Sequence, residues 1–148
     1  MFKIMETPIG NLKISEEDQY LVGIELTEED AVDCRSEILD NAERQIREYF
    51  EGTRKEFSLS YRLSGSDFHL AVLSALALIP YGKTITYTEL AQAIGKPNAR
   101  RAVGGALNRN PLLILLPCHR VLGSDRSLTG FAAGLKNKEF LLKHEGSI

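Results

Sequence analysis

The chain has only two cysteines among its 148 residues, Cys34 and Cys118, which is too few for a disulfide scaffold. Their wide separation fits a reducing compartment, so we expect an intracellular protein. The longest apolar run, residues 70–79, is too short and interrupted to span a bilayer, and no targeting segment is visible. Only Cys34 and no histidine precede His69, so four nitrogen or sulfur ligands for zinc cannot be assembled there. The sequence therefore predicts no metal and no membrane segment.

Positive charge is scarce in the first half of the chain. Residues 1–66 hold 8 Lys and Arg against 15 Asp and Glu, a net charge of −7, whereas residues 67–148 hold 10 against 5, a net charge of +5; together they give the overall −2. A basic half on an acidic chain favours a surface that binds an anion, although ordinary solvated surface explains the charge equally well. The basic residues concerned are Lys83, Lys96, Arg100, Arg101, Arg109, Arg120 and Arg126.

The first 65 residues combine a strand pattern with one helix pattern. Short apolar stretches alternate with turn residues, which predicts an antiparallel β-meander. The expected strands are 2–5, 12–15, 20–26 and a short one at Phe57 and Leu59. From about Ser36 the apolar spacing becomes helical, and Gly52 is placed to end this helix. We expect the helix to pack on the meander and a domain boundary near residue 65.

Residues 66–148 have the pattern of a mostly helical domain. The expected helices are 67–79, 86–95, 99–108 and 135–144. Ser66 or Asp67 can cap the first, Thr86 with Glu89 forms a capping box for the second, and Asn98 can cap the third. The fold class predicted is α+β, with an N-terminal domain at 1–65 and a helical domain at 66–148.

The second and third of these helices, joined by a short turn, form a helix-turn-helix pattern. The third is basic and carries unusually small side chains, among them two adjacent glycines, Gly104 and Gly105. Each glycine costs a helix about 1 kcal/mol relative to alanine, so a close approach to another surface is expected there. That surface is either DNA or a neighbouring helix, and the pattern alone leaves both open.

A reactive tetrapeptide follows the run of five aliphatic residues at 112–116, which predicts a buried strand. It consists of Pro117, Cys118, His119 and Arg120. A thiol beside an imidazole and a guanidinium can be held as the thiolate, because nearby positive charge favours the charged form. Cys118 is therefore a candidate nucleophile. The alternative is a cysteine that only fills space in the core, which is the commoner role of this residue type.

Taken together, these motifs resemble those of the O6-alkylguanine-DNA alkyltransferases, also called methylated-DNA-protein-cysteine methyltransferases. The matching stretches, in chain order, are Ile79-Pro80-Tyr81-Gly82, Thr86-Tyr87-Thr88-Glu89-Leu90-Ala91, Arg101-Ala102-Val103-Gly104-Gly105-Ala106, Asn110-Pro111, Pro117-Cys118-His119-Arg120-Val121 and Leu141-Leu142-Lys143-His144-Glu145-Gly146. The resemblance is tight over residues 66–146 and looser in the first domain, for which it implies a ribonuclease-H-like fold.

The resemblance implies single-turnover DNA repair, in which an alkyl group moves from O6 of guanine, and secondarily from O4 of thymine, to Cys118. By motif position, His119 would activate the thiol through a water molecule and Glu139 would orient His119. This is the logic of a base and an orienting group behind a nucleophile. Asn110 would support the backbone of the active site, and Tyr87 would turn the phosphate of the nucleotide and donate a hydrogen bond to guanine. Without the resemblance, Glu139 would be an ordinary exposed helix position.

Because O6 lies inside the duplex, the nucleotide must be flipped out, at a cost of a few kcal/mol. The resemblance assigns the wedge to Arg101, with Arg100 as its rival, and places the helix in the minor groove, where binding depends weakly on sequence. The expected DNA-binding residues are Arg101, Tyr87, Ala102, Gly104, Gly105 and Arg109. The expected pocket residues are Leu107, Val121, Phe131, Ala132 and Ala133. Ala133 stands where the family often has glycine, which favours methyl over bulkier alkyl groups.

The expected partner is double-stranded DNA containing O6-alkylguanine, bound by a monomer that needs no cofactor and works in the cytoplasm, at the nucleoid if the cell is prokaryotic. Two other functions stay open on the sequence alone. One is a lesion-binding protein without transfer activity, against which the presence of Cys118 argues. The other is a helix-turn-helix regulator that reads the major groove and performs no covalent chemistry.

Overall fold

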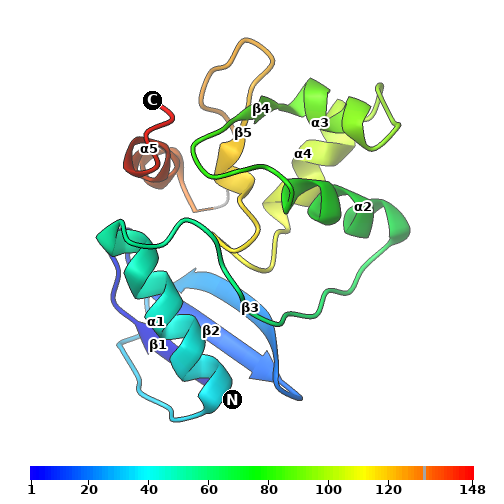
Figure 1. Cartoon of the computed structure of the whole chain (residues 1–148). Coiled ribbons are helices and arrows are strands. Elements are labelled where there is room, and N and C mark those ends of the chain that lie inside the picture. The colour runs from blue at the N-terminus through cyan, green and yellow to red at the C-terminus, as the bar shows by residue number, and fades with distance from the viewer. Residues whose placement is uncertain (132) are drawn as a thin grey trace. The chain divides into compact units, whose positions relative to one another are not determined.

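The computed structural model describes residues 1–131 and 133–148. It divides into two compact units: unit 1 comprises residues 1–63 with 111–113, and unit 2 comprises 64–110 with 114–148. Figure 1 traces the order of their elements along the chain. Strands and one long helix make up unit 1, whereas unit 2 is mostly helical. The expected α+β class is therefore confirmed. Among the described residues, no helix has the length and apolar character that crossing a membrane requires.

The sheet of unit 1 is an antiparallel meander with strand order β1-β2-β3. Its strands are β1 (Phe2–Met5), β2 (Asn11–Glu17) and β3 (Tyr20–Thr27), as the alternation of apolar and turn residues predicts. Isolated bridges cover both edges of the sheet: Val32 pairs with Ile4 of β1, while Tyr61 and Leu112 pair with β3. The covered edges leave few backbone groups free for pairing with another chain.

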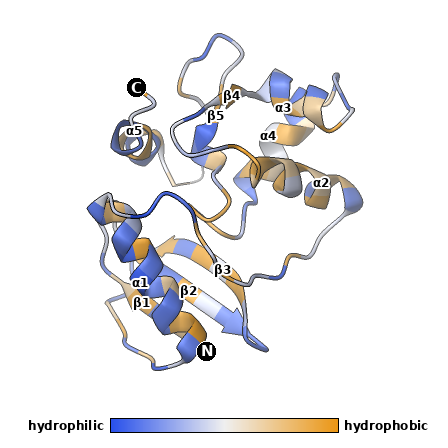
Figure 2. Ribbon diagram, viewed as in Figure 1, coloured by the Kyte–Doolittle hydropathy of each residue, from blue (hydrophilic) through white to orange (hydrophobic). Residues whose placement is uncertain are grey.

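Helix α1 (Glu37–Glu51) packs on this sheet (Figure 1). Ser36 caps its N-terminus by accepting a hydrogen bond from the backbone of Leu39, and Gly52 ends it at φ 83°, as expected. Hydrophobic and hydrophilic residues alternate along the helix in Figure 2, and the buried stripe is Leu39, Ala42, Gln45, Ile46 and Tyr49. The expected strand at Phe57 and Leu59 is wrong, because the backbone there bonds to β3 only further on, through Ser60 and Arg62.

Unit 2 contains four α-helices among its described residues: α2 (Asp67–Leu76), α3 (Tyr87–Ala93), α4 (Arg100–Asn108) and α5 (Leu135–His144). Ser66 caps α2, and both hydrogen bonds of the predicted capping box between Thr86 and Glu89 are present. The expected cap at Asn98 is wrong: the position before α4 is Ala99, which makes no side-chain cap. Helices α3 and α4 pack against each other and against α2.

A parallel ladder of two residues, which the sequence did not predict, joins β4 (Ile85–Thr86) to β5 (Val121–Leu122). Figure 1 shows the two strands side by side. Strand β4 leads directly into α3, and β5 follows a single 3₁₀ turn, η1 (Cys118–Arg120). The ladder therefore fixes the start of α3 beside the segment that carries Cys118.

The aliphatic run at 112–116 is buried but is not the expected strand. Only Leu112 pairs with β3, and the chain then turns through Ile114, whose φ is 71°. A β-branched residue rarely adopts this left-handed conformation, so the bend is strained and must be stabilised by its surroundings. Burial supplies that stabilisation, since Leu112, Ile114 and Leu116 are each at most 2% exposed.

Candidate active site and nucleic-acid interface

Cys118 lies in the 3₁₀ turn η1 and is only 4% exposed. Its backbone nitrogen donates to the carbonyl of Leu116 at 2.8 Å, and the side-chain amide of Asn110 donates to the same carbonyl at 2.8 Å. Asn110 also forms a hydrogen bond with the Cys118 side chain. The asparagine therefore holds both the backbone before the thiol and the thiol itself.

Burial raises the pKa of the Cys118 thiol, although the hydrogen bond from Asn110 and the positive charge of Lys138 oppose this rise. The resting side chain is therefore the neutral thiol, and the expectation that neighbouring charges hold a thiolate is wrong. Arg120 does not supply such a charge, because its guanidinium is engaged elsewhere. A reaction at this sulfur needs a base that removes the proton.

His119 is fully buried and its Nε2 lies 2.7 Å from Oε2 of Glu145. Burial lowers the pKa of His119, more than the carboxylate raises it, so the imidazole is neutral at rest. A neutral ring that donates from Nε2 to the carboxylate keeps Nδ1 as an acceptor. Within the described residues, Nδ1 is buried and has no hydrogen-bond partner. His119 can therefore take up a proton at Nδ1.

Arg120 binds the same glutamate from another side. Its Nε lies 2.8 Å from Oε1 of Glu145 and its Nη2 lies 3.1 Å from Oε2, while Nη1 donates to the carbonyl of Ile79 at 2.6 Å. The side chain of Glu145 is fully buried. A two-point pair of this kind holds the carboxylate in one orientation. Arg120 is therefore a structural anchor and not part of the basic surface.

Glu139, the residue expected to orient His119, lies elsewhere. Its carboxylate pairs with Lys143, one turn further along α5, at 3.0 Å, and both side chains are about half exposed. The buried positions of the last helix and its end are Lys138, Leu141, Leu142 and Glu145, which follow one another at helical spacing. Glu139 lies at the side of this buried face, and its side chain is 47% exposed. Glu145 is the orienting carboxylate, and the assignment of Glu139 is corrected.

Lys138 is a buried charged residue near Cys118 that the sequence analysis missed. Its side chain is fully buried, and Nζ donates to the carbonyls of Val121 and Thr129 at 2.6 and 2.8 Å. Burial lowers its pKa to about 8. The ammonium thus joins the end of η1 to the segment before α5 and places a positive charge close enough to affect the titration of Cys118. The signal that could have identified it is its helical spacing with Leu141 and Leu142.

Tyr87 is the first residue of α3, directly after the ladder strand β4. Its hydroxyl lies 3.0 Å from the carbonyl of Thr129 and 3.1 Å from that of Gly130. Gly130 has φ 53°, and a Cβ there would lie 3.2 Å from the tyrosine oxygen. Glycine is thus required by both the backbone and the close approach. The carbonyl of Thr129 accepts hydrogen bonds from both Tyr87 and Lys138 and therefore links these two side chains.

Helix α4 presents Arg101 and Ala102 to solvent, together with the half-buried Gly104 and Gly105, and Arg109, which caps its C-terminus, is exposed as well. A Cβ on Gly104 would meet only the Tyr87 ring, at 3.9 Å, and one on Gly105 only the Arg109 side chain, at 3.6 Å. Neither is a close backbone approach. Of the two explanations for these glycines, a tightly packed neighbouring helix is therefore not supported within the described part of the chain.

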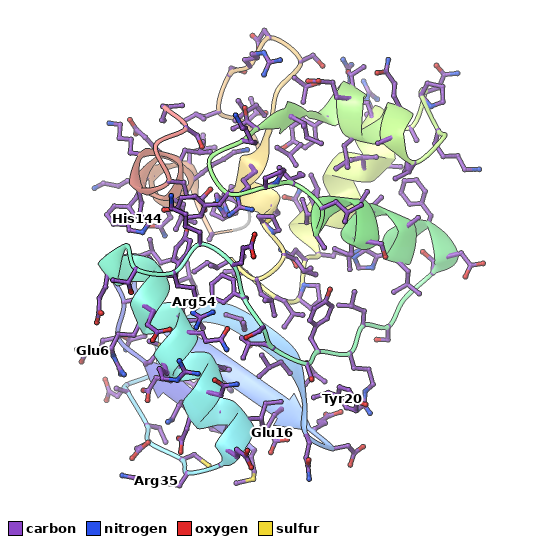
Figure 3. The ribbon with its side chains drawn as sticks, viewed as in Figure 1. Glu6, Glu16, Tyr20, Arg35, Arg54 and His144 are labelled. Atoms are coloured by element: carbon purple, nitrogen blue, oxygen red, sulfur yellow. The ribbon has the colours of Figure 1, made fainter. Side chains whose placement is uncertain are left out.

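The arginines at 100, 101 and 109 differ from four of the five arginines of unit 1 in their partners. In the part of the chain that the structure describes, Arg100, Arg101 and Arg109 form no ion pair with a carboxylate. Four arginines of unit 1 each pair with a glutamate: Arg44, Arg47, Arg54 and Arg62. Figure 3 shows Arg54 beside α1, whose Glu48 it contacts at 2.8 Å. The charge on α4 is thus available to an external anion, such as a nucleic-acid backbone.

The residues expected to line a base pocket differ in burial. Leu107 and Val121 are buried, whereas Phe131 and Ala133 are partly exposed. Ala132 lies outside the described residues. Val121 follows Cys118 through the 3₁₀ turn, and Leu107 is near the end of α4, two turns after Arg100.

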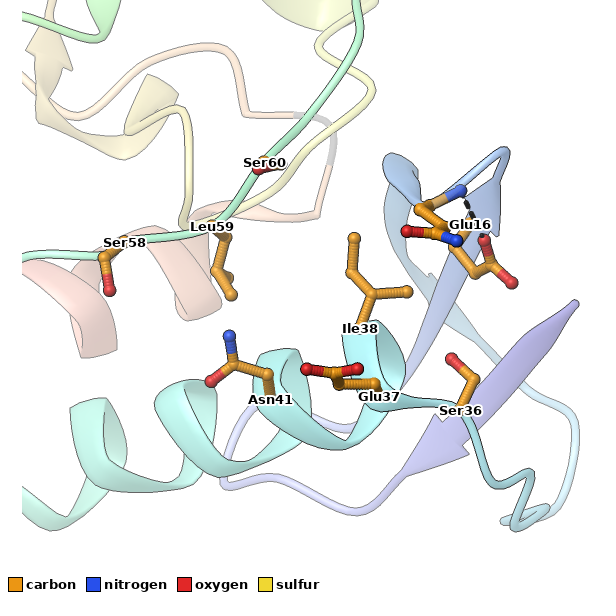
Figure 4. A pocket seen from close by; sticks show the side chains of 9 residues that line it. Glu16, Ser36, Glu37, Ile38, Asn41, Ser58, Leu59 and Ser60 are labelled. Carbon is orange, nitrogen blue, oxygen red and sulfur yellow. Dashed lines mark hydrogen bonds between the residues drawn. The ribbon is translucent and has the colours of Figure 1, made fainter.

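A pocket of about 410 Å³ lies in unit 1 beside the N-terminus of α1 (Figure 4). Its polar lining includes the carboxylates of Glu16 and Glu37 and the hydroxyls of Ser36, Ser58 and Ser60. Two carboxylates would repel a phosphate, so this pocket is no nucleic-acid site. Across residues 1–131 and 133–148, no three His, Cys, Asp or Glu side chains gather in a way that could hold a metal ion.

Comparison with protein families gives two matches that together span almost the whole chain. Residues 1–63 match the ribonuclease-like domain of 6-O-methylguanine DNA methyltransferase, and residues 67–147 match the DNA binding domain of the same family. The methylated-DNA–protein-cysteine methyltransferase of Methanosarcina barkeri is 44% identical over 151 residues, covering 97% of this chain and 96% of the relative. The constitutive enzyme of Bacillus subtilis is 42% identical, covering 95% and 92%.

Solved structures agree with these matches. The crystal structure of Mycobacterium tuberculosis O6-methylguanine methyltransferase is similar with a TM-score of 0.89 and 36% identity, covering 99% of this chain and 92% of the other. The structure of M. tuberculosis OGT in complex with DNA has a TM-score of 0.89 and 37% identity, covering 97% and 91%.

Proposed function

The chain belongs to the 6-O-methylguanine DNA methyltransferase family, and from this membership we propose that it repairs DNA by moving a methyl group from O6 of guanine to Cys118. O4 of thymine is a secondary substrate. The observation that carries this proposal is the buried thiol directly followed by a neutral histidine, whose one ring nitrogen is held by Glu145 while the other can accept a proton.

The first step is removal of the thiol proton. His119 accepts it at Nδ1 through a water molecule, and the resulting imidazolium is stabilised by Glu145, 2.7 Å from Nε2. The hydrogen bond from Asn110 and the charge of Lys138 both favour the thiolate. These residues offset the burial that keeps the resting sulfur protonated.

The second step is a direct displacement at carbon. The Cys118 thiolate attacks the methyl carbon, the S–C bond forms as the C–O6 bond breaks, and the electron pair of the broken bond stays on the guanine. Tyr87, released from its carbonyl contacts, donates a hydrogen bond to the base that receives this charge. The methyl thioether is not cleaved again, so each molecule acts once.

Nucleotide flipping precedes both steps. Arg101 occupies the space in the stack that the base leaves, and the small residues Ala102, Gly104 and Gly105 allow α4 to approach the minor groove closely. Arg109 contacts the backbone, while Leu107, Val121, Phe131 and Ala133 line the pocket around the base. The available charge of α4 supports this assignment. We place the protein with DNA in the cytoplasm, as a monomer that requires no cofactor.

Mass spectrometry tests the proposal directly. The protein is mixed with a duplex oligonucleotide that contains one O6-methylguanine, and the intact mass and the Cys118 peptide are measured. We expect one methyl group on this peptide, none on the Cys34 peptide, and none at all with a Cys118→Ser variant. An unmodified Cys118 peptide, with the lesion still in the DNA, would contradict the proposal, even if the protein bound the duplex.

Arg101→Ala should slow transfer from duplex DNA about 10-fold, because the variant loses the group that stabilises the flipped state, a state that costs a few kcal/mol to reach. Transfer from single-stranded DNA should change much less, since no base pair has to open. Single-turnover rates on the two substrates provide the measurement. Equal losses on both substrates would show that Arg101 contributes general affinity and not the wedge.

A further inference from the structure

The pocket beside the N-terminus of α1 takes no part in the proposed methyl transfer, and all the residues that line it belong to unit 1. Its volume of about 410 Å³ lies within the range of about 300–1,000 Å³ that is usual for small-molecule sites in proteins. Three segments enclose it: the end of β2 with the turn after it, the first turns of α1, and residues 58–60. We refer to this cavity as the α1 pocket.

The two carboxylates of the α1 pocket, Glu16 and Glu37, carry charge that unit 1 does not neutralise. Within the described residues neither forms an ion pair, and Glu16 accepts a hydrogen bond from the backbone nitrogen of Gln19 at 3.2 Å. Further along α1, in contrast, Asp40 pairs with a lysine and Glu48 with an arginine. Glu37 is in the first turn of the helix, where the helix dipole favours the ionised carboxylate. The α1 pocket therefore holds two negative charges that an external cation can neutralise.

The rest of the lining indicates the chemical class of that cation. In Figure 4 the aliphatic side chains of Ile38 and Leu59 point into the pocket, and the hydroxyls of Ser36 and Ser60 also line it. Within the described residues no three side chains of the types that bind metal ions gather at one place, and a metal ion would gain nothing from the aliphatic groups. An ammonium on an aliphatic stem uses both parts of the lining. Its three N–H groups donate to the carboxylate and hydroxyl oxygens, while its methylene groups lie against apolar surface.

We propose that the α1 pocket binds an aliphatic ammonium group, carried either by a free diamine or polyamine or by a lysine side chain of another protein. Glu16 and Glu37 accept its hydrogen bonds, and Ile38 and Leu59 cover its methylene groups. No residue of this pocket belongs to the site around Cys118, so the inference goes beyond the proposed function and does not depend on it.

Titration calorimetry of the full chain with 1,4-diaminobutane at low salt tests the pocket. Glu16→Gln and Glu37→Gln should each weaken binding about 5-fold, because each variant loses one partly exposed ion pair to the ligand. Glu51→Gln is the matched control: it makes the same change of charge at the exposed last residue of α1, outside the pocket lining, and its affinity should equal that of the wild type. The rate of methyl transfer should be unchanged in all three variants.

Mg²⁺ distinguishes the pocket from general attraction of cations to an acidic surface. It carries the same charge as the diamine but no methylene groups, so it should bind at least about 10-fold more weakly, a difference that burial of two methylene groups supplies. Equal affinities for Mg²⁺ and the diamine would overturn the inference, as would a Glu37→Gln protein that binds the diamine as tightly as Glu51→Gln does.

Nuclear magnetic resonance of the wild type locates the ligand without depending on the folding of a variant. The diamine should shift the backbone amide signals of the residues that line the α1 pocket, whereas shifts spread over the other carboxylates of unit 1 would overturn the inference. A Gly-Lys-Gly peptide with blocked termini separates the two sources of the ammonium. If it binds the pocket at least as tightly as the diamine, the ligand is a lysine side chain of a protein; if it binds more weakly, the ligand is a free amine.

Discussion

The free energy of unfolding of a Glu145→Gln protein should be about 3–5 kcal/mol lower than that of the wild type. Its transfer of the methyl group should be about 1000-fold slower. The glutamate is fully buried between His119 at 2.7 Å and Arg120 at 2.8 Å. An amide there leaves the Arg120 charge buried without a counter-ion, and it no longer fixes which nitrogen of His119 carries the proton. Denaturant unfolding and single-turnover transfer measure the two effects.

Glu139→Gln is the matched control, because it makes the same chemical change on the same helix. Its ion pair with Lys143 is half exposed, so the free energy of unfolding should fall by less than about 0.5 kcal/mol. Its rate of methyl transfer should equal that of the wild type. Transfer should be compared well below both unfolding midpoints, with lesion binding as a check that Glu145→Gln is folded. If instead Glu139→Gln lost transfer and Glu145→Gln retained it, His119 would be oriented by a residue other than the one we assign.

A Lys138→Met protein should lose about 2–4 kcal/mol of stability and about 100-fold in transfer rate. The variant leaves the carbonyls of Val121 and Thr129 without the ammonium that contacts them at 2.6 and 2.8 Å. It also removes a charge that favours the Cys118 thiolate. Small displacements of the segment around Thr129 are sufficient for a rate loss of this size. Lys143→Met, at an exposed position of α5, should have neither effect.

The pH dependence of stability provides an independent check on Lys138. Its folded pKa of about 8 is below the ordinary value of 10.5, so above pH 8 the unfolded chain holds a proton that the folded protein has lost. Unfolding then takes up protons, and the stability of the wild type rises with pH relative to Lys138→Met, by about 1 kcal/mol between pH 8 and 9. A constant difference over this interval would mean that the buried amine does not titrate there.

Local signals in the sequence predicted most elements of the fold correctly. The capping box of Thr86 and Glu89, the cap at Ser66 and the ends of α5 each depend on neighbouring residues, so no knowledge of the tertiary structure is needed. The strand predicted at 112–116 was wrong because an apolar run indicates burial but does not determine the backbone conformation. Its bend at Ile114 is fixed by the surrounding packing, which the sequence pattern does not contain.

The candidate site was predicted in part, and the failures share one cause. The sequence placed Cys118 and His119 side by side and Asn110 before the proline, and the structure brings all three to one place. Glu145 and Lys138 were missed because charged residues are expected at the surface. Helical spacing from the buried Leu141 and Leu142 would have placed both Lys138 and Glu145 on the inner face.

The two-residue ladder between β4 and β5 determines which changes of chain length the chemistry tolerates. It aligns Ile85 with Val121 and thereby fixes the start of α3 relative to η1, whatever the length of the turn at 94–99. That turn can grow without altering the ladder. A single deletion between Cys118 and Val121 would instead shift the register and take away a carbonyl that Lys138 contacts. Length variation should therefore accumulate in the turn before α4 and be excluded after the cysteine.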